Sequence, residues 1–181
     1  MVLIDGSNFY FKLKDLGLHN LINFDFSGFI KKLATNNEII RAVYYIGKVS
    51  TGSKSDKGRK MLTNQQKLFE HLKKHNFNYS LGYLLKSGGV FHEKGVDVNI
   101  AVDMLVAAYE NLCDRIILVS SDTDLLPAIK KAKEKGKIIE YIGFSHKASL
   151  AMVANCSTSR LLNKEDLLPF VKPDNKKGKE K

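Results

Sequence analysis

Apolar and polar positions alternate along the chain in two patterns, one typical of short buried strands and the other of helices. Apolar runs rich in β-branched and aromatic residues, each ending near Gly, Asp or Ser, indicate strands. Apolar residues three and four positions apart indicate helices. The expected strands are 2–5, 41–46, 77–85, 115–119, 138–142 and, at a sheet edge, 160–162. The expected helices are 9–16, 26–33, 61–75, 97–112, 123–134, 149–154 and 164–170.

This succession of strands and helices predicts the fold class. Strands that alternate with helices form a mainly parallel sheet with helices on both faces. The right-handed crossover rule then favours a Rossmann-like three-layer α/β/α sandwich. Two polar stretches, 48–60 and 86–95, are expected to be loops. The 181 residues are most simply one domain, 1–171, followed by a basic tail, 172–181, that is expected to be disordered.

Bulk composition indicates a soluble protein of a reducing compartment. No stretch approaches the roughly 20 apolar residues that a membrane span requires. Met1 is followed almost at once by Asp5, with no basic leader or cleavage site. Cys113 and Cys156 form no motif and are expected to be reduced. We therefore expect a cytoplasmic protein with no membrane partner, whose oligomeric state the sequence leaves open.

The net charge points to a polyanionic partner. Lys and Arg number 29 against 19 Asp and Glu, which gives +10. Residues 172–181 carry five Lys, one Asp and one Glu, or +3, so the folded body retains +7. An excess of this size favours nucleic acid through counterion release. A basic proteome or a solubilising tail would also account for part of it.

Four aspartates, Asp5, Asp97, Asp122 and Asp124, stand at predicted strand ends or helix starts. In open parallel sheets, ligands bind outside the carboxyl ends of the strands. Carboxylates crowded there repel one another unless a cation neutralises them. Helix capping is the alternative for each residue, and Asp-Gly is also a turn signal. One cap needs only one Asp, however, so two Asp beside Ser120 with a further strand-end Asp favour an acidic site.

The chemistry that suits such a site is that of a hard divalent ion. Mg²⁺ and Mn²⁺ prefer oxygen ligands and would activate water against a phosphodiester. Asp97 and Asp103 lie six residues apart on one predicted helix, about 240° round from each other, so both cannot face the ion. We assign Asp97 to the metal and Asp103 to a supporting position. His71 and His75, four apart, have no evident third ligand for zinc.

Basic residues follow two predicted strands on the same side as the aspartates. They would hold phosphates without reading sequence. Tyr10, Phe91 and Phe144 could stack unpaired bases, although core packing is the simpler explanation for each. The candidate nucleic-acid-binding residues are Lys48, Lys54, Lys57, Arg59, Lys60 and Lys94.

Three short motifs occur in order within about residues 1–145. They are Ile4-Asp5-Gly6-Ser7-Asn8, Lys94-Gly95-Val96-Asp97 with Asp103, and Val119-Ser120-Ser121-Asp122-Thr123-Asp124 followed by Leu125 and Pro127. Together they resemble the NYN domains of the LabA-like group, within the PIN-like nuclease superfamily. Ser121 and Leu125 depart from the Gly and Phe common in that family.

The resemblance implies a PIN-like fold and a divalent-metal-dependent ribonuclease. Asp5, Asp97, Asp122 and Asp124 become the catalytic, metal-binding carboxylates. Asn8 and Ser120 become the residues that orient them, with Ser121 close to the metal. RNA as the substrate comes from the resemblance alone, because no residue here can be assigned to a 2′-hydroxyl contact.

Two other functions fit the same residues. A non-catalytic RNA-binding or regulatory module would keep the acidic pocket without turnover. A phosphohydrolase of small nucleotides would use the same metal, although it would not need so extended a basic rim. Endonuclease or exonuclease action, and one or two metal ions, are left open.

Overall fold

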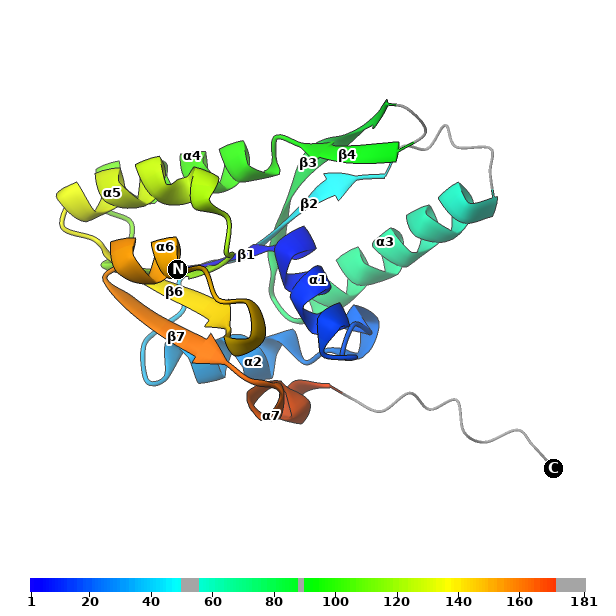
Figure 1. Cartoon of the computed structure of the whole chain (residues 1–181), viewed down its shortest axis with the longest axis horizontal. Helices are drawn as coiled ribbons and strands as arrows, with labels where there is room; N and C mark the ends of the chain where they lie inside the picture. The colour runs from blue at the N-terminus through cyan, green and yellow to red at the C-terminus, as the bar shows by residue number, and fades with distance from the viewer. Residues whose placement is uncertain (50–55, 88–89, 172–181) are drawn as a thin grey trace.

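A single seven-stranded sheet organises residues 1–49, 56–87 and 90–171, the part of the chain that the computed structural model describes (Figure 1). All neighbouring strands are parallel except β3 and β4, which are antiparallel. In the order β4-β3-β2-β1-β5-β6-β7, the strands are Val90–Lys94, Asn78–Ser87, Ala42–Lys48, Val2–Asp5, Arg115–Val119, Ile138–Phe144 and Thr158–Leu162. The predicted α/β class with a mainly parallel sheet is confirmed.

Helices cover both faces of the sheet and form two separate cores. Val2 and Ile4 of β1 pack towards α1, α2, α3 and α7, whereas Leu3 packs towards α4, α5 and α6. None of the helices in the described ranges is both long and apolar enough to cross a bilayer. The α-helices are α1 Gly6–Asp15, α2 Phe26–Ala34, α3 Asp56–Lys74, α4 Val96–Tyr109, α5 Leu126–Glu134, α6 Leu150–Asn155 and α7 Lys164–Leu167. Short 3-10 turns are Leu21–Asn23, Thr123–Leu125, Ser145–Lys147 and Leu168–Phe170.

The predicted loop 86–95 is wrong over most of its length, because β3 extends to Ser87 and a further strand follows. Val90–Lys94 is the edge strand β4, paired antiparallel with β3. This strand begins with only two apolar residues, Val90 and Phe91. A run of two is too short for an alternating pattern to be recognised. The loop predicted at 48–60 also ends earlier, because α3 begins at Asp56 with a polar first turn. Residues 50–55 and the tail 172–181 lie outside the described residues.

The central helix α4 buries one side against the sheet. Ile100 and Met104 are fully buried there. Its outer side is not polar, because Val98, Val102 and Tyr109 are exposed. Apolar side chains therefore occupy both sides of this helix.

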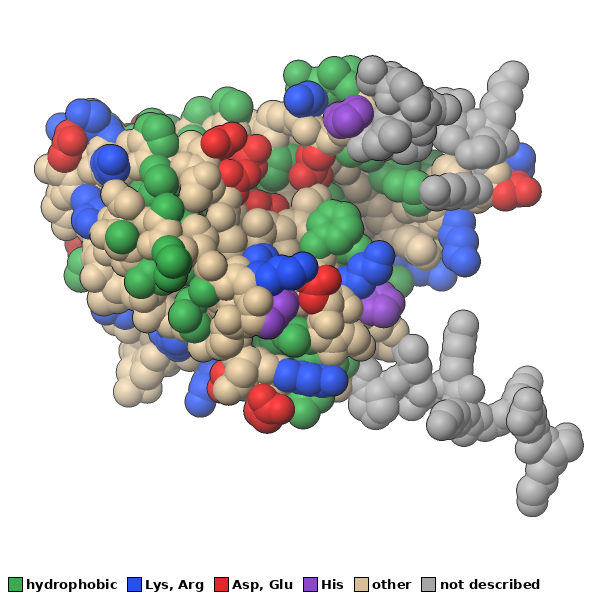
Figure 2. Space-filling view, viewed as in Figure 1, with side chains coloured by type: hydrophobic (Ala, Val, Ile, Leu, Met, Phe, Trp, Pro, Cys, Tyr) green, Lys and Arg blue, Asp and Glu red, His purple; other side chains and the backbone are tan. Residues whose placement is uncertain are grey.

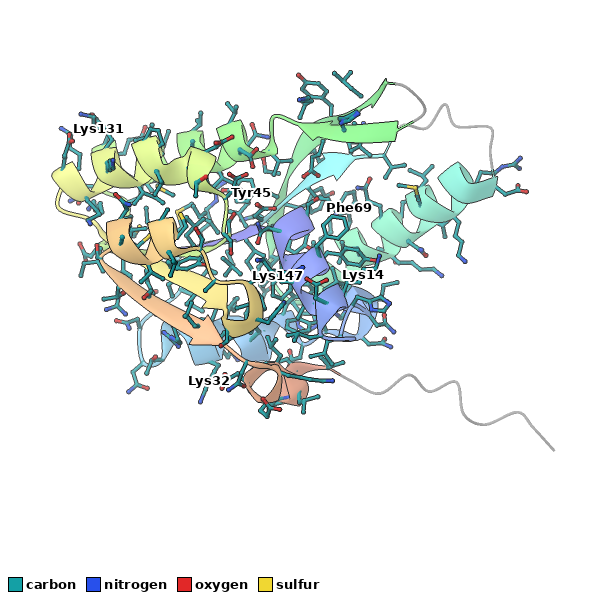
Figure 3. The ribbon with its side chains drawn as sticks, in the orientation of Figure 1. Lys14, Lys32, Tyr45, Phe69, Lys131 and Lys147 are labelled. Atoms are coloured by element: carbon teal, nitrogen blue, oxygen red, sulfur yellow. The ribbon has the colours of Figure 1, made fainter. Side chains whose placement is uncertain are left out.

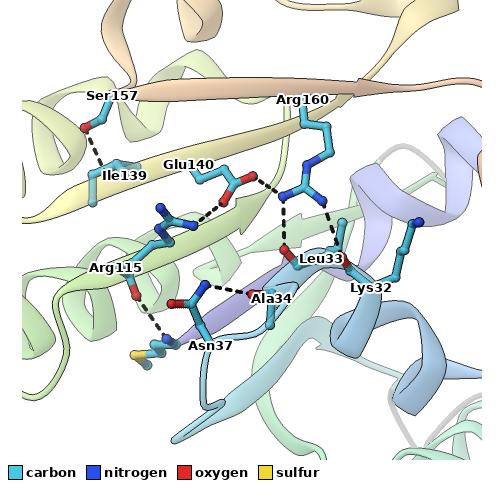
Figure 4. A network of polar contacts seen from close by, with 10 residues as sticks. Lys32, Leu33, Ala34, Asn37, Arg115, Ile139, Glu140, Ser157 and Arg160 are labelled. Atoms are coloured by element: carbon cyan, nitrogen blue, oxygen red, sulfur yellow. Dashed lines mark hydrogen bonds and ion pairs between the residues drawn. The ribbon is translucent and has the colours of Figure 1, made fainter.

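A buried carboxylate joins the last three strands (Figure 4). Glu140 of β6 is 5% exposed and lies between Arg115 of β5 and Arg160 of β7. Arg160 also donates to the carbonyl of Leu33, at 3.0 Å, at the end of α2. This network fastens the edge strand β7 and the end of α2 to the sheet.

Candidate active site

The carboxyl ends of β1 and β5 meet where the chain connections diverge to opposite faces of the sheet. After β1 the chain enters α1 on one face, and after β5 it enters α5 on the other. The strand ends at such a divergence are the usual place for a ligand in an open α/β sheet. Asp5 ends β1, and Ser120 follows β5 directly. The two most strongly placed sequence motifs therefore meet at the topological switch point.

Asp5 is held by two donors, one from each motif. Its Oδ1 accepts the Asn8 amide at 3.0 Å, which caps α1, and its Oδ2 accepts the Ser120 hydroxyl at 2.9 Å. The Ser120 oxygen in turn accepts the Asp122 amide at 3.1 Å. Asn8 bridges the same two segments, since its Oδ1 accepts the Ser121 amide at 3.3 Å. Asn8 and Ser120 thus fix the orientation of the buried Asp5 carboxylate.

Asp122 and Asp124 begin the short turn that follows β5. The Asp122 Oδ1 accepts the Asp124 amide at 2.9 Å, so this aspartate does cap the turn. Asp124 itself is exposed. The Ser121 hydroxyl lies 2.9 Å from that of Tyr141, on β6. Ser121 therefore ties the loop to the sheet rather than contacting the Asp5 carboxylate.

Asp97 approaches the edge from α4 and has no capping role. The N-cap of α4 is Gly95, at φ +80°, with no side-chain hydrogen bond, and Asp97 lies in the first turn. Glycine suits a backbone position with a positive φ of this kind, because it has no Cβ. The alternative of Asp97 as the N-cap is therefore wrong. Its side chain remains available to the acidic edge.

Glu93 is a fifth carboxylate at this edge that sequence reasoning missed. It stands on β4, and its Oε2 accepts the Gly47 amide at the end of β2. It lies close enough to raise the pKa of both Asp5 and Asp97. Its position depends on the β3–β4 hairpin, which the apolar pattern did not reveal.

Burial and neighbouring carboxylates raise the pKa of two aspartates at the edge. Burial raises the pKa of Asp5 to about 6, with Asp97 and Glu93 adding to the rise. Burial also raises the pKa of Asp97, and Asp122, Glu93 and Asp124 add to it. Figure 2 shows acidic side chains gathered at a hollow beside α4 and β4. Crowded carboxylates whose charged forms are disfavoured are suited to a cation.

Oxygen donors at this edge match the chemistry of Mg²⁺ or Mn²⁺, but their geometry is open. Within the described ranges, no group of three or more His, Cys, Asp or Glu side chains is placed so that it could hold a metal ion. The carboxylates of Asp5, Asp97 and Asp122 gather at one edge without closing around a point. The donor set fits a hard divalent ion, and binding one would require the side chains to draw together.

Asp103 lies away from this edge. Its Oδ2 accepts the Tyr45 hydroxyl at 2.6 Å and lies 3.6 Å from the Arg41 guanidinium, near the start of β2. Figure 3 shows Tyr45 between the sheet and α4. The contacts of Asp103 thus fasten α4 to the sheet, and none of them reaches the four candidate carboxylates.

The predicted basic residues fall around the β2–β4 side of the edge. Lys48, Lys60 and Lys94 are exposed, and the exposed Arg59 pairs with Asp56 at 3.7 Å. Lys54 lies outside the described residues, as does the side chain of Lys57.

A second basic group, missed in the sequence, lies across the edge. Lys12 of α1 donates to the carbonyl of Lys147 at 2.7 Å, and the Lys147 amine pairs with Asp15. His146 adjoins the same carboxylate at 3.7 Å. His146 and Lys147 follow the carboxyl end of β6, and Lys12 stands beside them on α1, so the acidic edge has basic side chains on both sides.

His71 and His75 serve the fold instead of zinc. The Nε2 of His71 lies 2.7 Å from the carbonyl of Phe24, and the Nδ1 of His75 lies 2.9 Å from the Ser27 hydroxyl. Both histidines therefore hold the segment that leads into α2. Phe144, one of the candidate stacking residues, is 1% exposed and belongs to the core.

Gly6 allows α1 to start directly behind Asp5. A Cβ there would lie 2.3 Å from Cε1 of Tyr44 and 2.5 Å from the Tyr45 carbonyl oxygen, and backbone cannot yield as a flexible side chain can. Gly6→Ala is therefore expected to lower the free energy of unfolding by about 3 kcal/mol, the upper range for overpacking. Urea unfolding measures this, with Ser7→Ala as the control in the same turn. A Gly6→Ala variant as stable as the control would contradict the close approach.

The fold and the acidic edge together define an α/β/α domain of the PIN-like type. The family model described as the NYN domain matches residues 1–162, and the chain belongs to this family, which is part of the PIN-like nuclease superfamily. The family relates the chain to nucleases, which generally use divalent metal ions.

Two other proteins are similar to this chain. The solved structure of a protein of unknown function from Vibrio parahaemolyticus has the same fold, with a TM-score of 0.66 over 92% of this chain and 93% of that one, at 22% identity. An uncharacterized protein of Methanocaldococcus jannaschii is 48% identical over 48 residues, 26% of this chain. The match spans only 20% of that protein's length.

Proposed function

We propose that the protein is a divalent-metal-dependent ribonuclease that hydrolyses RNA phosphodiester bonds at the acidic edge. The observation that carries the proposal is the buried Asp5, which faces other carboxylates at the switch point and has its pKa raised to about 6. A protein retains such an unfavourable arrangement when a cation or a reaction requires it. The NYN family match supports nuclease chemistry, and the LabA-like motifs support RNA as the substrate.

Each residue has a distinct task in this proposal. Asp5, fixed by Asn8 and Ser120, would anchor the ion, and Asp97 and Asp122 would approach it from α4 and from the loop after β5. Mg²⁺ or Mn²⁺, when bound, would supply an acidified water and neutralise charge on the phosphate. Asp124, exposed at the rim, would either bind the ion or orient the attacking water.

The basic residues on both sides of the edge support a polymeric substrate. Lys48 and Lys94 lie on one side, and Lys12 and Lys147 on the other. A strand crossing the acidic edge would meet a positive charge before and after the scissile phosphate. A single nucleotide would not need positive charge on both sides. Cleavage of an oligonucleotide, compared with hydrolysis of a nucleoside monophosphate, separates the nuclease from a small-nucleotide phosphohydrolase.

A non-catalytic RNA-binding module is the second candidate, and one observation favours it. The described carboxylates do not form a closed metal site. Calorimetric titration with Mn²⁺ distinguishes the two functions. The ribonuclease requires a measurable heat of binding, whereas the module requires RNA binding with no heat from Mn²⁺.

Asp97→Asn is expected to weaken Mn²⁺ binding at least about tenfold, because even residues that only orient metal ligands cost ten- to a hundredfold in affinity. The matched control is Asp114→Asn, an exposed aspartate just before the other end of β5. It should leave the calorimetric binding constant unchanged. Equal losses in both variants would point to non-specific binding of Mn²⁺ by surface carboxylates.

A further inference from the structure

We propose that the cleft between α1 and α3 binds an unpaired base of the RNA whose phosphate lies at the acidic edge. This inference rests on the proposed ribonuclease function. The cleft has a volume of about 540 Å³, within the usual range for ligand pockets. Its floor is β2, with Tyr44 and Ile46, and its walls are helices α1 and α3 with the segment after α1.

The lining indicates a neutral occupant. None of the described residues that line the cleft is Asp, Glu, Lys or Arg, in a chain with 29 basic and 19 acidic residues. The amide of Gln65 is already engaged, since its Oε1 accepts the Val49 amide at 2.9 Å and its Nε2 donates to the Gly47 carbonyl at 2.8 Å. Apart from His19, this lining offers a phosphate no side chain that could carry a positive charge, whereas the uncharged part of a nucleotide would fit.

Aromatic rings at one end of the cleft suit a base. Tyr10 has its ring centroid 5.5 Å from that of Phe11 and 6.2 Å from that of His19. Phe11 is 59% exposed although it is fully apolar. Bases stack on such rings regardless of sequence, because every base has a π-face. Asn64 and Ser7, which also line the cleft, offer polar groups to the edges of a base.

The cleft is continuous with the acidic edge. Gly6 and Ser7 line it, and they follow Asp5 directly at the start of α1. A base between α1 and α3 would therefore belong to a nucleotide next to the phosphate at Asp5. Base pairing would hinder its entry, so single-stranded RNA is the substrate class that this arrangement selects.

The test measures binding of the whole protein to fluorescein-labelled hexauridylate and to an abasic strand of equal length and charge. Binding is followed by fluorescence anisotropy in EDTA. The chelator prevents metal-dependent cleavage, so the result does not depend on catalysis. We expect the abasic strand to bind roughly fivefold to a hundredfold more weakly, the contribution of one stacked base. Equal affinities would overturn the base cleft while leaving the ribonuclease proposal to its own tests.

Variants of Tyr10 locate the effect. Tyr10→Ala should remove the preference for the base-containing strand, whereas Tyr10→Phe, which keeps the ring, should retain it. Photocrosslinking of the wild-type protein to 4-thiouridine-substituted hexamer adds a measurement that needs no variant. A crosslinked peptide within 6–22, 44–49 or 61–68, the segments that line the cleft, is the expected result. Crosslinks confined to other segments would overturn the proposal. So would a cleft that binds an apolar peptide and shows no preference for the base-containing strand over the abasic one.

Discussion

Asp5→Asn is expected to abolish RNA cleavage and, in metal-free protein at pH 7.5, to make the fold more stable. Loss of the anchoring carboxylate should lower cleavage by more than about a hundredfold, since residues that merely orient metal ligands already cost up to that factor. The gain in stability has a separate cause. Asp5 is 5% exposed, and burial raises its pKa from 3.8 to about 6. Its charge is therefore unfavourable in the folded state.

The pH dependence gives the sign of the effect. The folded protein binds the Asp5 proton more tightly than the unfolded chain does, so the stability contributed by this group is complete below pH 3.8 and is lost as the pH rises through about 6. At 1.36 kcal/mol per pH unit, the loss amounts to about 3 kcal/mol above pH 6. Asn carries no such charge. It has only one side-chain oxygen, however, so it loses one of the two carboxylate acceptors that bind the Asn8 amide and the Ser120 hydroxyl. We therefore expect a net gain of about 1–3 kcal/mol.

Urea unfolding in EDTA at pH 4 and pH 7.5 checks this expectation. The advantage of Asp5→Asn over wild type should appear at pH 7.5 and shrink towards pH 4. Asp124→Asn, an exposed position, is the control and should stay within about 0.5 kcal/mol of wild type at both pH values. A variant that is less stable than wild type at pH 7.5 would show that the Asp5 carboxylate is not strained by burial.

The second large effect is expected at Glu140. Glu140→Ala should lower the free energy of unfolding by about 3 kcal/mol, the cost of breaking a buried ion pair. It removes the partner of Arg115 and Arg160 and thereby weakens the attachment of β7 and the end of α2. Thermal or urea unfolding measures the loss.

An exposed ion pair provides the matched control. Glu134 of α5 pairs with Lys131 at 2.6 Å, with both side chains largely exposed. Glu134→Ala should cost less than about 1 kcal/mol, as surface pairs usually do. Equal losses in the two variants would mean that the three-strand network around Glu140 does not contribute beyond an ordinary surface pair.

The central strands were predictable because burial on both faces leaves an unmistakable apolar run. The segments 2–5 and 115–119 were predicted with the bounds that the structure has. Their parallel pairing brings Asp5 and Ser120 within 2.9 Å, as expected from the rule on strand carboxyl ends. The edge strand β4 was missed because an edge needs less apolar surface. Glu93 was missed with it.

Side-chain direction on a helix was harder to predict than helix position. Angular spacing separated Asp97 from Asp103, and the structure keeps them apart. Angular spacing could not reveal the partners of Asp103. Tyr45 lies on β2, 58 residues away in the sequence, and Arg41 directly precedes that strand. Likewise, the cleft beside Tyr10 depends on how α1 and α3 pack, which no local pattern encodes.

Cleavage of a 5′-labelled single-stranded RNA by purified protein tests directly whether the acidic edge hydrolyses RNA. Wild-type protein should give discrete products with Mn²⁺ and leave the RNA intact with EDTA. Asp122→Asn, purified in parallel, keeps a side chain that can cap the turn after β5 and should leave the RNA intact. RNA left intact by wild-type protein in Mn²⁺, or cut equally by Asp122→Asn, would contradict the assignment of RNA hydrolysis to this acidic edge.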